Sequence, residues 1–72
     1  MMPRYFFQIT NGTPYEDDTG EELRDDGEAW VSAKRLTRDI EDSLEPGGKW
    51  TVVVRDSGGP VYEISIAGRK LR

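Results

Sequence analysis

The sequence predicts an α+β fold in which a four-stranded antiparallel sheet, built in the order β-β-α-β-β, packs one face against a single helix. Three stretches, at 4–10, 49–55 and 61–67, alternate apolar with polar residues as half-buried strands do. Between 29 and 44, apolar residues recur every three or four positions, which is typical of a helix with one buried face. A chain of 72 residues has room for one core, so we expect residues 1–72 to form a single domain.

The first predicted hairpin begins with the strand at residues 4–10. Its apolar face carries Tyr5, Phe7 and Ile9. Phe6 interrupts the alternation, because it falls on the opposite face. Asn11-Gly12 is a strong hairpin signal, since both central positions of a type I′ turn need a positive φ. The returning strand is expected at residues 14–17, at an edge of the sheet, because its proline cannot donate a ladder hydrogen bond.

The helix is predicted to begin at Asp25 and to end before residues 45–48. Asp25 is a good N-cap, and Glu28 three residues later completes a pattern that resembles a capping box. The sequence Glu-Pro-Gly-Gly at 45–48 stops the helix. A turn is expected at 18–20, and Leu23 then anchors the connection to the helix. The apolar face of the helix carries Ala29, Ala33, Leu36, Ile40 and Leu44.

The second hairpin is predicted from strands at 49–55 and 61–67, joined by a turn at 56–60. With the four strands numbered along the chain, the order 2-1-3-4 makes every neighbouring pair antiparallel, and this is the order we expect. The predicted core consists of Phe7, Ile9, Leu23, Ala33, Leu36, Ile40, Leu44, Val52, Val54, Ile64 and Ile66. The predicted margin of this core consists of Tyr5, Trp30 and Trp50.

The composition excludes several kinds of chemistry. The chain has no cysteine and no histidine, so it lacks thiol nucleophiles, disulfides, the commonest general base and the commonest transition-metal ligand. A small chain without disulfides suits a reducing compartment. Its longest apolar runs, at 5–7 and 52–54, are far shorter than the ~20 residues that cross a bilayer. We therefore expect a cytoplasmic protein that does not bind membranes.

Charge is unevenly distributed along the chain. Residues 16–28 hold eight acids and one arginine, a net charge of −7, whereas the remainder of the chain is at +3. The segment is either an electrostatic interface or a solvated connection that keeps a small protein soluble. Residues 17–28 have the length of a calcium loop, but Glu22 occupies the position where the sharp turn needs glycine. We therefore expect no metal site there.

Catalysis is not expected either. Acidic pairs such as Asp17 and Glu21 lie in an exposed connection, without the dry pocket that separates the pKa values of a catalytic pair. The serines have no histidine to activate them. The glycine pairs at 47–48 and 58–59 have neither the Lys-Ser/Thr of a P-loop nor a following helix. The sequence predicts a protein that is not an enzyme and uses no cofactor.

A set of residues spread over most of the chain is distinctive. It comprises Pro-Arg-Tyr-Phe-Phe at 3–7, Gly12, Asp18, Gly20, Leu-Arg-Asp at 23–25, and the stretch 50–66 with Asp56 and Gly59 at its turn. Together they resemble a family of short alphaproteobacterial proteins known only as a domain of unknown function. One departure is Gln8, where such proteins often carry histidine. The resemblance implies the same fold and a bacterial cytoplasmic setting, and it implies no activity.

The remaining prediction is a domain that works by binding. Phe6 and Val53 fall on the sheet face opposite the helix, with Arg4, Thr51 and Arg55 around them. An exposed apolar patch rimmed by polar groups is typical of an interface, so we expect a protein partner or a homodimer to use this face. A monomer with two stray exposed apolar residues is the competing interpretation.

The alternative function is nucleic-acid binding through Arg4, Arg55 and the basic tail at 69–72. Tyr5 and Phe6 would then offer a platform on which bases stack. The isoelectric point of about 4.7 argues against this alternative, because nucleic-acid-binding domains are usually basic.

Overall fold

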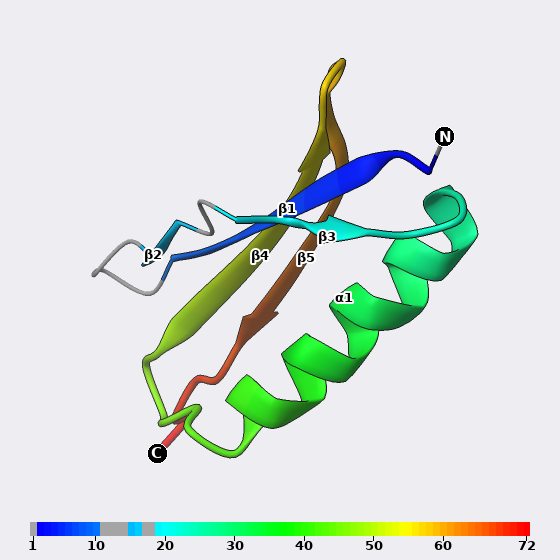
Figure 1. The fold of residues 1–72 in the computed structure, drawn as a ribbon. Helices are drawn as coiled ribbons and strands as arrows, with labels where there is room; N and C mark the ends of the chain where they lie inside the picture. Colours follow the sequence, from blue (N-terminus) through cyan, green and yellow to red (C-terminus); the bar gives the residue numbers. More distant parts are fainter. Residues whose placement is uncertain (1, 11–14, 17–18) are drawn as a thin grey trace.

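The computed structural model of the chain describes residues 2–10, 15–16 and 19–72, with the backbone alone for 15–16. The elements follow in the order β1 (Arg4–Thr10), β2 (Tyr15–Glu16), β3 (Glu21–Glu22), α1 (Asp26–Glu41), β4 (Lys49–Asp56) and β5 (Gly59–Ala67). The expected α+β class and the β-β-α-β-β order of the main elements are confirmed (Figure 1). The turn predicted at 11–12, the proline of the returning strand and the acids at 17–18 lie outside the described residues.

The sheet has the strand order β2-β1-β4-β5, and every neighbouring pair is antiparallel. This confirms the strand order expected from the sequence. The sequence does not predict β3. β3 is a short additional strand that pairs with β1 at Arg4↔Glu22 and Tyr5↔Glu21. Because β4 occupies the other edge of β1, β2 and β3 share one edge. β2 lies beside the end of β1, and β3 lies beside its start.

α1 begins where its capping residues predict. Asp25 is extended, with a φ of −162°, and its side chain accepts a 2.9 Å hydrogen bond from the backbone N–H of Glu28. This contact satisfies one of the N–H groups that the first helical turn leaves unpaired. The helix ends at Glu41, before the last predicted apolar position at Leu44, whose N–H donates to the carbonyl of Glu41 in the following turn.

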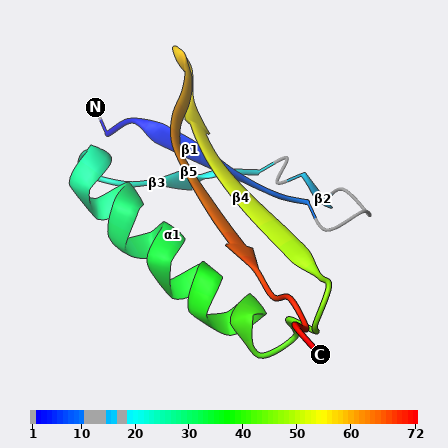
Figure 2. The same ribbon diagram turned by 180° about the vertical axis from the view of Figure 1, so that it is seen from behind.

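The helix covers one flank of the sheet more than its centre. Opposite views place α1 beside β5, on the side away from β2 (Figures 1 and 2). The core lies between the helix and the central strands. Its buried apolar side chains are Tyr5, Phe7, Leu23, Ala29, Ala33, Val52 and Val54. Tyr5, expected at the margin, is only 1% exposed.

Six residues predicted in the core are only half-buried. They are Ile9, Leu36, Ile40, Leu44, Ile64 and Ile66. The reason is the limited cover that one helix gives to a sheet in a domain of this size. Ile64 and Ile66 lie on β5, which among the described residues has a strand neighbour on one side only, so part of each side chain stays open to solvent.

A β-bulge interrupts the long hairpin near its turn. Val54 pairs with Tyr62 and Arg55 pairs with Pro60, so Val61 has no partner on β4. Val61 and Tyr62 both pack against the core as a result. Because of this extra residue, the alternation of side chains between the two faces shifts by one position along β5.

Candidate open-face site

The sheet register brings the five predicted interaction residues to one face. Phe6 pairs with Arg55, and Thr10 pairs with Thr51. Their neighbours along the strands are the buried side chains of the core, so by alternation these residues point away from α1. We call this surface the open face; it carries Arg4, Phe6, Gln8, Thr10, Thr51, Val53, Arg55, Glu63 and Ser65. No described helix or strand packs on it.

Arg4 already has a structural role at one end of the open face. Its guanidinium donates a 2.7 Å hydrogen bond to the carbonyl of Thr19 and lies 3.1 Å from the carboxylate of Glu22. The two side chains of the ion pair are 45% and 58% exposed, so their attraction is weakened by solvent. These contacts hold the segment around β3 against β1.

Phe6, which the sequence leaves without a structural role, contacts the same segment. Gly20 has a φ of +73°, and a Cβ placed on it would lie 2.8 Å from the Phe6 ring and 2.9 Å from the Arg4 side chain. The backbone at Gly20 therefore rests directly on Phe6, which is half-buried. Phe6 is thus less available to a partner than the sequence suggests.

Val53 and Arg55 form an accessible part of the open face. Val53 is half-buried and pairs with Glu63 on β5. Arg55 is exposed and makes no ion pair within the described part of the chain. Thr51 lies on the same face two residues before Val53, and its hydroxyl oxygen is 3.5 Å from the hydroxyl oxygen of Ser65. Val53 therefore lies two residues from a cation on its own strand and directly opposite an anion on β5.

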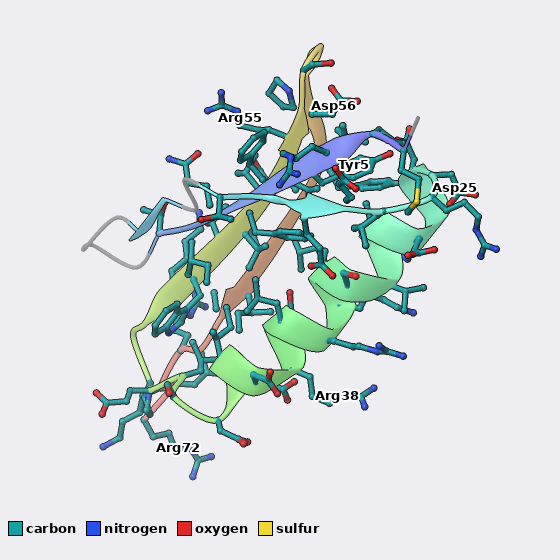
Figure 3. All side chains as sticks on the ribbon, viewed as in Figure 1. Tyr5, Asp25, Arg38, Arg55, Asp56 and Arg72 are labelled. Carbon is teal, nitrogen blue, oxygen red and sulfur yellow. The ribbon has the colours of Figure 1, made fainter. Side chains whose placement is uncertain are left out.

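The cations invoked for nucleic-acid binding do not gather at one place. Figure 3 shows Arg55 near the β4–β5 turn and Arg72 at the opposite end of the molecule. The tail leaves the sheet at Gly68, whose N–H donates to the carbonyl of Gly48 just before β4 begins. Arg55 lies at the other end of β4. Arg4 is held by Thr19 and Glu22.

Several acids of the −7 segment have intramolecular partners. Glu22 pairs with Arg4, Asp25 caps the helix, and Glu28 lies 3.6 Å from Arg24 one helical turn away. Over residues 2–10, 15–16 and 19–72, no three His, Cys, Asp or Glu side chains gather as a metal site. In the same residues, no helix has the length and apolar character to cross a bilayer.

Asp26, another acid of the −7 segment, accepts a 2.6 Å hydrogen bond from the hydroxyl of Tyr5. This hydrogen bond raises the pKa of Tyr5 to about 12, with help from burial and from the nearby carboxylates of Asp56 and Asp25. The neutral phenol is therefore the form that the fold stabilises. The contact joins the first strand to the first turn of the helix.

A second surface lies between α1 and β5, where sequence reasoning placed no site. A groove of about 380 Å³ runs there. It is lined by Trp30, Lys34, Thr37, Arg38, Glu41 and Ile64. The spacing of the helical residues is a readable signal, since positions 30, 34, 37 and 41 form one stripe beside the buried face. The position of the helix over β5 is what turns this stripe into the wall of a groove.

The fold and the open face together define a small sheet-and-helix domain without an assigned chemistry. The family model described as Domain of unknown function (DUF6894) matches residues 4–67, and the chain therefore belongs to that family. No curated protein and no solved structure matches the chain.

Proposed function

We propose that this protein is a small protein-interaction domain that joins to a second copy of itself through the open face. The observation that carries the proposal is the grouping of Val53, Arg55 and Glu63 on a face that no described helix or strand covers. Sheet faces that combine an apolar centre with a charged rim are suited to reversible association.

The arrangement of charges supports a second copy as the partner. Val53 is directly opposite Glu63 and is two residues from Arg55 on the same strand, so it neighbours both charges. A two-fold axis that places Arg55 opposite Glu63 of the second copy would therefore pass close to Val53. Two valines would then pack together between two Arg–Glu pairs, as an isologous interface requires. Each copy therefore presents a positive charge where the other presents a negative one.

The test is sedimentation equilibrium of the full chain over a range of concentrations. We expect reversible dimerisation of the natural sequence and a monomer for Val53→Asp, because the substitution places a desolvated charge at the axis. The matched control is Val31→Asp, which changes an equally apolar residue that is 43% exposed on α1, in the other layer. A natural chain that stays monomeric, or a Val53→Asp variant that dimerises normally, would contradict the proposal.

A further inference from the structure

β5 leaves one edge of the sheet without a strand partner among the described residues. It spans Gly59–Ala67, and its strand neighbour is β4. Residues 61–67 contain no proline, so each has both a backbone N–H and a C=O. In an edge strand, every second residue directs these groups away from the sheet, where they can pair with another strand.

The helix forms the second wall of a groove along this edge. Both views show α1 and β5 side by side (Figures 1 and 2). Of the residues that line the groove, Ile64 comes from β5 and the others come from α1. None of the lining residues comes from β4. A strand added at this edge would lie beside β5, next to the residues of α1 that line the groove.

The groove has an apolar part that the fold leaves partly exposed. Trp30 is 37% exposed, and its ring centroid lies 5.1 Å from that of Tyr62 on β5. Ile64 is half-buried, whereas Val52 and Val54 on the neighbouring strand are at most 1% exposed. Apolar surface on β5 is therefore available to an added side chain.

The groove also has a positive wall. Lys34 and Arg38 are one helical turn apart, and both are exposed. Neither makes an ion pair within the described part of the chain. Glu41 is the acid among the lining residues. A carboxylate entering the groove would thus meet two cations that form no ion pair with the described residues.

We propose that this groove binds an extended peptide with acidic side chains, which adds to β5 as a further strand. The peptide backbone pairs with the open edge, because only another strand matches the spacing of its N–H and C=O groups. Side chains that face α1 bring carboxylates to Lys34 and Arg38 and an apolar group to Trp30. The proposal concerns a different surface from the open face and does not depend on the dimer.

A second copy of this chain fits the groove less well than an acidic peptide. Two copies joined through β5 about a two-fold axis would each bring α1 to the interface, because the helix lies along that edge. Lys34 and Arg38 would then face the same two cations of the other copy. Like charges in such an arrangement repel.

The first experiment measures binding of labelled peptides to the full chain by fluorescence anisotropy. The probe is a library of capped peptides of about ten residues, long enough to span the nine residues of β5, in which every second position is Glu or Asp except for one, which carries the apolar residue meant for Trp30. The remaining positions vary among Val, Ile, Thr, Leu and Phe. We expect acidic members to bind and the same peptides with Lys in place of the acids not to bind. Failure of every acidic member, or equal binding of the Lys peptides, would overturn the proposal.

Backbone pairing is tested on the best acidic peptide by N-methylation. One version carries N-methyl groups on the odd residues and the other on the even residues. Strand addition predicts that one version loses binding and the other keeps it, because alternate N–H groups face β5. Two versions that behave alike would rule out strand addition.

The positive wall is tested with the double variant Lys34→Glu/Arg38→Glu. We expect it to bind the acidic peptide about tenfold more weakly, because each change replaces an attraction with a repulsion. The control is Arg35→Glu/Arg69→Glu, which alters net charge equally but lies outside the groove, since Arg35 lines a hollow on the other side of α1. Circular dichroism checks that both variants fold. Equal weakening in the two variants would mean that net charge, and not the groove, attracts the peptide.

Discussion

The hydroxyl of Tyr5 donates a 2.6 Å hydrogen bond to Oδ1 of Asp26, and this contact ties the buried first strand to the first turn of the helix. The two residues are 21 positions apart in the chain, so the contact fixes the long connection between the two elements. It also explains why an aromatic residue expected at the margin is 1% exposed and still satisfies its polar group.

Replacing Tyr5 with Phe should lower the thermal unfolding midpoint at neutral pH, because Asp26 loses its donor. The pKa of Tyr5 is raised from 10.0 to about 12 in the fold, so the stability it gives is complete below pH 10 and falls as the pH rises towards 12. The difference in the free energy of unfolding between the natural chain and Tyr5→Phe should therefore narrow over this interval. Urea unfolding at several pH values measures this difference. A difference that stayed constant with pH would contradict the raised pKa of Tyr5.

Gly20→Ala should destabilise the fold far more than Gly47→Ala. Both glycines have positive φ values, +73° and +86°, but a Cβ on Gly47 meets nothing within 4 Å. A Cβ on Gly20 would lie 2.9 Å from the backbone oxygen of Tyr5, which cannot move aside. We expect a loss of about 3 kcal/mol for Gly20→Ala and about 1 kcal/mol for Gly47→Ala. Equal losses in urea unfolding would show that the contact with β1 is unimportant.

Asp25→Ala should cost about 1 kcal/mol of unfolding free energy, because the N–H of Glu28 loses its acceptor. Asp25→Asn keeps an oxygen at the same position and should retain most of the stability. Chemical denaturation followed by circular dichroism compares the three proteins. If both variants lost the same amount, the charge of Asp25 and not its cap would be the stabilising feature.

Two adjacent valines on β4 should respond very differently to truncation. Val54 is fully buried, so Val54→Ala should lower the unfolding free energy by about 2–3 kcal/mol. Val53 lies on the open face, and Val53→Ala should cost the monomer less than about 1 kcal/mol. Denaturation at a concentration well below any association measures both. A similar cost at the two positions would mean that something packs on the open face.

The strand order and the start of the helix follow from local signals. Asp25 with Glu28 marks the N-cap, and the alternation along residues 4–10 and 49–55 assigns each side chain to a face. For the same reason Arg4, Phe6, Thr51, Val53 and Arg55 could be predicted to share one face. The binding role assigned to them remains a prediction.

Other features depend on contacts that a linear pattern does not contain. The pair Glu21–Glu22 has no strand signal of its own; it becomes β3 because β1 offers an edge and Arg4 offers a partner. The contact between Phe6 and Gly20 needs that same segment in place. The groove beside Trp30 follows from the position of α1 along β5, which strand order alone does not determine.

The central claim is the self-complementary open face, and a charge exchange between Arg55 and Glu63 tests it most directly. Sedimentation equilibrium would compare the natural chain with Arg55→Glu, Glu63→Arg and the double variant that carries both changes. Each single change should weaken dimerisation about tenfold, because it puts like charges opposite each other at two symmetric places. The double variant restores both pairs and should dimerise nearly as well as the natural chain. A double variant weaker than either single variant, or four proteins that sediment alike, would contradict the account.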